Sequence, residues 1–248
     1  MTTLVHELRY QQLAFWRSRE SAVFVFVFPL LLYALLGSVY DETIDDLPAG
    51  DVLLAGLLGY GCANTAFAGL AISLVIRRES GILKRIRSTP LPAPVYAAAT
   101  LGSVLVTFVL QTIALFALGR LLFDASLPDR PGSLALAVLF GAAAFAALGL
   151  GAAALIRSDE GASAVVNVIL LPMAFLSGSF GPTRDFPDWL EAIADVLPLK
   201  HYLEIVNGIY LADESFWSDP GSLAMVAAWG LLGLAIAWRR FGWEPRER

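Results

Sequence analysis

Residues 77–92 read Arg-Arg-Glu-Ser-Gly-Ile-Leu-Lys-Arg-Ile-Arg-Ser-Thr-Pro-Leu-Pro, a short basic stretch between two long apolar runs. Lys and Arg concentrated this close to an apolar run are typical of a loop on the cytoplasmic side of a membrane. The stretch therefore sets the orientation in which the rest of the chain is interpreted.

The composition of the 248-residue chain indicates an integral membrane protein. Hydrophobic residues make up 57% and charged residues 16%, and the mean hydropathy is +0.67. Soluble domains carry about 25% charged residues. Several uncharged runs are each long enough to cross a hydrocarbon layer of about 30 Å. Because these runs occupy most of the length, we expect no soluble catalytic domain beside them.

The apolar runs predict an all-α membrane protein with six transmembrane helices in a single domain over residues 21–240. Residues 1–20 mix apolar and charged side chains, as an amphipathic helix in the cytoplasmic interface would. Pro29 is expected to bend the first span, and residues 241–248 form a cytoplasmic tail. The predicted spans are residues 21–40, 52–76, 94–119, 133–156, 161–180 and 221–238.

Two short amphipathic helices are predicted between the fifth and sixth spans, over residues 186–197 and 199–211. Apolar residues recur in both at helical spacing, against carboxylates and Lys200. Neither is apolar enough to span, and Pro198 separates them. They are expected at the outer surface.

The Lys and Arg residues divide unequally between the two sides that six spans define. Arg120, Arg130, Arg184 and Lys200 fall on one side, and the other thirteen of the seventeen fall on the other. The positive-inside rule places the richer side, and with it both termini, in the cytoplasm. Most carboxylates lie on the outer side, so the net charge of −5 reflects an acidic outer face.

Several classes of function are disfavoured by missing residues. The spans hold almost no ionisable residue away from their ends, whereas ion-driven transporters place such groups at membrane depth. His6 and His201 have no Cys, Ser or carboxylate at a ligand or triad spacing. No Gly-x-x-x-x-Gly-Lys-Ser/Thr motif is present to hold nucleotide phosphates. We expect no ion coupling, no catalytic or metal site, no bound cofactor and no ATP hydrolysis by this chain alone.

The sequence resembles the type 2 permease family of ABC exporters over nearly its whole length, and most closely the short permeases of drug-export systems. The resemblance is carried by the six spans with their N-terminal interfacial helix and by the basic stretch 77–92. It is also carried by Pro-Met-Ala-Phe-Leu-Ser-Gly-Ser-Phe at residues 172–180, ahead of the paired amphipathic helices. The letters Leu-Ser-Gly-Ser are similar to an ABC ATPase signature, but here they end an apolar span, so we expect no ATP binding.

The resemblance implies a multi-pass protein of the cell membrane that works with partners. Two permease subunits, either identical or related, would form the pathway, and two copies of an ABC ATPase subunit would bind ATP and Mg beneath it. Membrane lipid is the remaining partner, and no nucleic acid is expected. The cargo would be an amphipathic drug-like molecule, a lipid or a glycan, moved outward.

The resemblance also implies that the basic stretch carries force from the ATPase. Residues 79–88 offer an apolar contact face, charges for ion pairs and a glycine that permits close approach. Two acidic residues in the second inner turn are candidates for a lesser contact. The alternative is a loop that only obeys the positive-inside rule and touches anionic lipid. The expected coupling residues are Glu79, Gly81, Ile82, Leu83, Lys84, Arg85, Ile86, Arg87, Asp159 and Glu160.

A second set of residues could line the pathway or gate it. For the polar groups at membrane depth the alternative is hydrogen bonding between helices, and for residues 176–180 it is close helix packing. For the outer helices, which resemble a re-entrant pair, the alternative is an interfacial anchor. The candidates are Tyr60, Asn64, Gln111, Asn167, Ser177, Phe180, Trp189 and Tyr202.

The hypothesis that follows is the permease subunit of an ATP-driven exporter. One alternative is a membrane scaffold or sensor that an ATPase controls without transport. Another is an intramembrane lipid-modifying enzyme, which would need His201 or an acidic outer residue.

Overall fold

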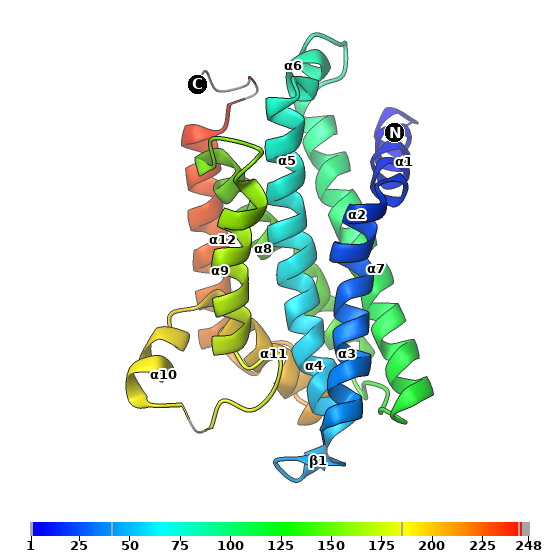
Figure 1. Ribbon diagram of the computed structural model, residues 1–248, viewed down its shortest axis with the longest axis vertical. Coiled ribbons are helices and arrows are strands. Elements are labelled where there is room, and N and C mark those ends of the chain that lie inside the picture. The colour runs from blue at the N-terminus through cyan, green and yellow to red at the C-terminus, as the bar shows by residue number, and fades with distance from the viewer. Residues whose placement is uncertain (1, 41, 185, 243, 245–248) are drawn as a thin grey trace.

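The computed structural model describes residues 2–40, 42–184, 186–242 and 244. The long helices run along a common axis in one bundle, and α1 and the last turn of α12 lie at the same end of it (Figure 1). Within these described residues, five helices are long and apolar enough to cross a membrane, so the protein is an all-α membrane protein. These five are Arg19–Val39, Ala49–Glu79, Ala93–Leu122, Pro131–Leu155 and Pro220–Arg240.

Two of the long helices are composite, because each contains a π-helical segment, labelled η. Ahead of the second lies a small antiparallel hairpin in which Thr43 pairs with Pro48. The elements are α1 (Thr2–Arg17), α2 (Arg19–Ser21), η1 (Ala22–Val27), α3 (Phe28–Val39), β1 (Thr43–Ile44), β2 (Leu47–Pro48), α4 (Ala49–Cys62), η2 (Ala63–Gly69), α5 (Leu70–Glu79), α6 (Ile82–Arg87), α7 (Ala93–Leu122), α8 (Pro131–Leu155), α9 (Ala162–Leu176), α10 (Asp188–Ala194), α11 (Pro198–Leu211) and α12 (Pro220–Arg240).

Five of the six predicted spans correspond to the five long helices. The predicted fifth span, residues 161–180, corresponds to α9, which has 15 residues and ends at Leu176. A helix of that length rises about 22 Å, which is less than the hydrocarbon thickness of a bilayer. Residues 177–180 continue the chain as turns.

The second long helix forms the centre of the bundle. All residues from 53 to 68 are buried, and α3, α7, α8 and α11 pack around them. On one flank α8 and α12 pack closely, since a Cβ on Gly233 would lie 2.5 Å from the carbonyl oxygen of Ala147. Only glycine fits at such a backbone contact, as is common between membrane helices.

The N-terminal helix α1 packs against the bundle through polar contacts. The Gln12 side-chain amide donates to the Ser103 carbonyl (2.7 Å) and to the Thr107 hydroxyl (3.2 Å), both on α7. The amphipathic helix predicted from the sequence therefore contacts α7 along one face.

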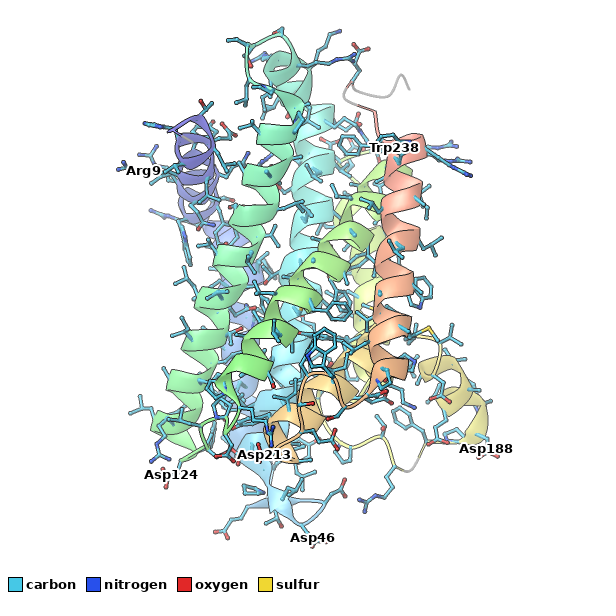
Figure 2. All side chains as sticks on the ribbon, turned by 180° about the vertical axis from the view of Figure 1, so that it is seen from behind. Arg9, Asp46, Asp124, Asp188, Asp213 and Trp238 are labelled. Carbon is cyan, nitrogen blue, oxygen red and sulfur yellow. The ribbon has the colours of Figure 1, made fainter. Side chains whose placement is uncertain are left out.

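Charges of opposite sign gather at opposite ends of the bundle. Figure 2 shows Arg9 and Trp238 at one end of the bundle, on opposite sides of it, and Asp46, Asp124 and Asp213 at the other end. The basic turn around α6 lies at the same end as α1 (Figure 1). The bundle therefore has a basic end and an acidic end, as the positive-inside count requires.

Candidate functional site

The basic stretch forms a short helix, α6, that projects from the basic end of the bundle (Figure 1). The chain turns between α5 and α6 at Gly81, whose φ is +73°. A left-handed conformation of this kind strongly favours glycine. A Cβ at Gly81 would have no atom within 4 Å. The turn therefore gives Gly81 a backbone role, and close approach by a partner at this glycine stays a prediction.

The side chains of α6 divide between the bundle and the exterior. Ile82 is 42% exposed, Ile86 is half-buried, and Lys84, Arg85 and Arg87 are exposed. Leu83 is completely buried within this chain. The prediction that Leu83 belongs to an external contact face is corrected, because this side chain is used internally.

Arg78 is the largest fully buried side chain among the described residues. Its guanidinium donates to the carbonyls of Ala153 (2.8 Å) and Ile156 (2.7 Å) and to the Glu79 carboxylate (2.7 Å). These carbonyls lie at the C-terminal end of α8, where helix carbonyls lack partners within the helix. Glu79, which we expected to pair with a partner chain, is instead paired within this chain.

Sequence reasoning treated Arg78 only as one cytoplasmic charge among thirteen. A signal was present, because Ala71, Leu74, Val75 and Arg78 follow helical spacing and lie on one buried face of α5. Arg77, one residue earlier, points elsewhere. It donates to the Tyr96 hydroxyl (3.1 Å) and to Gln11 of α1.

The second inner turn begins directly after the residue that Arg78 holds. Asp159 and Glu160 are exposed there, and the Asp159 carboxylate accepts from the Glu160 backbone N–H (3.1 Å). Both lie three to four residues after Ile156. The two inner segments named from the sequence are therefore linked through Arg78.

Two polar candidates, Asn64 and Gln111, bond to the first span where Pro29 interrupts its hydrogen bonding. Pro29 has no N–H to donate to the carbonyl of Phe24 or Val25, and the preceding N–H bonds five residues back, which makes η1. The Asn64 amide donates to the Phe24 carbonyl (2.9 Å) and the Gln111 amide to the Val25 carbonyl (2.7 Å). The geometry favours interhelical hydrogen bonding over a pathway lining for both.

Three aromatic candidates are used in packing within the chain. Tyr60 is buried against Phe180, with ring centroids 5.1 Å apart. Tyr202 is fully buried, and its ring packs on Phe145 at a centroid distance of 5.7 Å. Phe180 itself is half-buried.

The small-residue turn after α9 also packs closely against the bundle. The Ser177 hydroxyl donates to the carbonyl of Met173 in its own helix (2.6 Å). A Cβ on Gly56 would lie 2.5 Å from the Ser179 carbonyl oxygen. The turn after α9 therefore touches the second span at Gly56, about two turns from the start of α4.

Two candidates lie on the outside of this chain. Asn167 is exposed on α9, on the same helix as exposed Val168 and Phe175. Trp189 of α10 is 65% exposed. Of the pathway candidates, these two face the surroundings of the single chain.

A buried polar cluster at the acidic end was missed by sequence reasoning. The Asp51 carboxylate accepts hydrogen bonds from the Ser126 N–H (2.9 Å), the Ser126 hydroxyl (3.0 Å) and the Tyr210 hydroxyl (2.9 Å). These contacts join three parts of the chain, namely α4, the loop that precedes α8, and helix α11. From the sequence, Asp51 is only one of the carboxylates assigned to the outer side, and no local pattern indicates its distant partners.

The residues that an enzyme would need do not form a catalytic triad. Nδ1 of His201 faces both Glu204 (3.0 Å) and the Ser222 hydroxyl (3.1 Å), and Nε2 contacts the Asp195 carbonyl (2.8 Å). In a triad the serine and the carboxylate approach opposite ring nitrogens. Within the described ranges, no three His, Cys, Asp or Glu side chains are placed to hold a metal ion.

Comparisons with known proteins agree on one class. A model of the ABC-2 type transporter family matches residues 4–211. A Bacillus subtilis protein named as a transport permease, YvfS, is 27% identical over 198 residues, which cover 77% of this chain and 80% of the relative. The daunorubicin resistance ABC transporter permease protein DrrB1 of Streptomyces coeruleorubidus is 24% identical over 213 residues, or 82% and 71% of the two chains. An Escherichia coli protein named as a multidrug ABC transporter permease, YbhR, is 28% identical over 166 residues, or 64% and 44%.

Proposed function

Because the chain belongs to the ABC-2 type transporter family, we propose that it is the permease subunit of an exporter driven by ATP hydrolysis in a separate ATPase subunit. The observation that carries the proposal is α6, an exposed basic helix that follows directly after α5, whose last turn is tied to α8 through Arg78. A partner that moves α6 would move α8 with it.

In this proposal the basic end faces the cytoplasm of a cell membrane and both termini lie there. Two ATPase copies, holding ATP and Mg, bind beneath two permease subunits. The external contact is made by Ile82, Lys84, Arg85 and Arg87, with Ile86 at its edge. Asp159 and Glu160 provide the lesser contact, since the turn that carries them follows the carbonyls held by Arg78.

The remaining topology follows the same orientation. The transmembrane domain covers residues 21–240. In it α9, extended by the turn at residues 177–180, serves as a short fifth span, and α10 with α11 forms the outer re-entrant pair. The exposed face of α9, with Asn167, faces the second permease and the pathway. Phe180 and Trp189 lie at its outer mouth.

The cargo is proposed to be an amphipathic drug-like molecule, a lipid or a glycan. Two of the relatives carry drug-resistance or multidrug names, and the exposed surface of α9 is apolar apart from isolated polar groups such as Asn167. Such a surface suits a molecule that enters from the bilayer.

The test uses the complex of this chain with the ABC ATPase that co-purifies from its native membrane. Arg85→Glu/Arg87→Glu reverses two charges on α6, and Arg17→Glu/Arg19→Glu reverses two exposed charges at the same end outside it. We expect the α6 variant alone to lose ATPase co-purification and ATP-dependent flux of a fluorescent amphipathic drug into inverted vesicles. ATPase assembly and flux that survive in the α6 variant would contradict the coupling role. Co-purification with hydrolysis but no flux in the wild type would favour the scaffold or sensor.

A further inference from the structure

A groove opens on the outside of the bundle at its basic end, between the last turns of α8 and α12. It has a volume of about 540 Å³ and is lined by Leu155 of α8 and by Leu232, Ala235, Ile236, Arg239 and Arg240 of α12. The lining is therefore apolar along most of its length and carries two guanidinium groups at one end.

The order of these residues along α12 places the two chemistries at different depths. Arg239 lies seven residues after Leu232, which at 1.5 Å per residue is about 10 Å along the helix. Trp238, 91% exposed and at the basic end in Figure 2, lies between them. Exposed tryptophans gather at the headgroup level of a bilayer. The arginines are therefore at headgroup depth and the apolar wall at acyl-chain depth.

We infer that this groove binds an anionic phospholipid of the cytoplasmic leaflet. The phosphate contacts the guanidinium groups of Arg239 and Arg240, and an acyl chain lies on Leu155, Leu232 and Ile236. Basic pockets between transmembrane helices on the cytoplasmic side suit such headgroups. The assignment to the cytoplasmic leaflet rests on the orientation proposed above, whereas the inferred chemistry of the lipid rests only on the residues of the groove.

The helix end makes the arginines decisive for the choice of lipid. The C-terminal end of a helix carries partial negative charge and repels an anion. Without the two guanidinium groups the groove would keep its apolar wall but would disfavour a phosphate that carries net charge. Loss of both arginines therefore removes the preference for anionic over zwitterionic lipid, and not only part of the affinity.

The test measures lipid retention by native mass spectrometry of the purified full-length permease, with phosphatidylglycerol and phosphatidylcholine supplied in equal amounts. We expect wild type to retain phosphatidylglycerol preferentially and Arg239→Gln/Arg240→Gln to lower that preference roughly tenfold or more. Arg17→Gln/Arg19→Gln, which removes two charges at the same end of the bundle, is the matched control and keeps the preference. Equal effects of the two variants would overturn the proposal.

A second variant separates a seated lipid from attraction to surface charge. Leu232→Trp fills the apolar wall and leaves both arginines in place, and thermal unfolding verifies that each variant is folded. We expect phosphatidylglycerol retention to fall in this variant. Unchanged phosphatidylglycerol retention in Leu232→Trp would overturn the proposal. Full displacement of the lipid from the wild type by millimolar inorganic phosphate would also overturn it. The same holds if a variant loses a permease dimer while its lipid retention is unaltered. Because no ATPase is present, a negative result here leaves the transport proposal untouched.

Discussion

Two buried charged side chains, Arg78 at the basic end and Asp51 at the acidic end, are fixed in different ways. Arg78 donates to two carbonyls at the end of a helix, whereas Asp51 accepts from a loop residue and from the tyrosine of another helix. The first arrangement ties the end of α5 to backbone carbonyls at the end of α8, so in the proposed mechanism a displacement of α5 and α6 would be passed to α8. The second closes the outer loops over the bundle. The proposed coupling therefore assigns the transfer of movement to the basic end.

The largest expected effect comes from Arg78→Leu. The substitution leaves the Glu79 carboxylate and two helix-terminal carbonyls without their partner, and breaking a buried ion pair typically costs about 3–5 kcal/mol. Thermal unfolding in detergent measures the loss of stability. Arg85→Leu, at an exposed site on α6, is the control and is expected to change stability by about 0.5 kcal/mol or less. Similar stabilities of the two variants would contradict the anchoring role.

A smaller effect is expected from Asp51→Asn. The amide keeps one acceptor oxygen for the Ser126 or Tyr210 donor, so the loss is about 1–3 kcal/mol, the range for a buried group left unpaired. The same unfolding assay ranks it against Arg78→Leu. If Asp51→Asn lowers the free energy of unfolding as much as Arg78→Leu does, the two buried charged residues do not differ in the way described above.

Midway between the ends, Asn64→Leu is expected to cost about 1–2 kcal/mol, because the Phe24 carbonyl loses its donor. Pro29→Ala restores a backbone N–H, so in the double variant the same Asn64→Leu change should cost clearly less. Unfolding of the wild type, the two single variants and the double variant forms the cycle. If the free-energy costs of the two substitutions are strictly additive, the Asn64 amide does not replace the N–H that Pro29 lacks.

The smallest effect is expected from Asp219→Ala at the start of α12. The Ser222 N–H donates to this carboxylate (3.0 Å), and loss of such a cap costs about 1 kcal/mol. The same hydrogen bond lowers the pKa of Asp219 below its ordinary value. The contribution of the cap is therefore present at neutral pH and is lost as the pH falls through the lowered pKa. Stability of the variant and of the wild type should converge in acid, and a gap that persists there would contradict the role of the charge.

The main architecture could be predicted from the sequence because apolar runs and Lys/Arg distribution are local signals. Five spans and the basic end follow from them, and the two short amphipathic helices α10 and α11 follow from helical spacing, which is also local. The carbonyl partners of Arg78 and the partners of Asp51 could not be predicted, because these hydrogen bonds join residues 75 or more positions apart. Asn64 and Gln111 were identified as polar groups at membrane depth, but their attachment to carbonyls that Pro29 leaves unbonded required the helix packing. Leu83 was misplaced because its helical face depends on the turn at Gly81.

The most direct measurement is a photocrosslink from α6 in the assembled complex. Cys62 is the single cysteine of the chain and is buried, so Ile82→Cys can be labelled specifically with a photoactivatable maleimide. Trp217→Cys, exposed in the segment before α12, is the control. We expect position 82 alone to crosslink to the ATPase, with a yield that changes when ATP is added. Absence of a crosslink from position 82, or equal yields from the two positions, would contradict the assignment of α6 as the point where the ATPase acts.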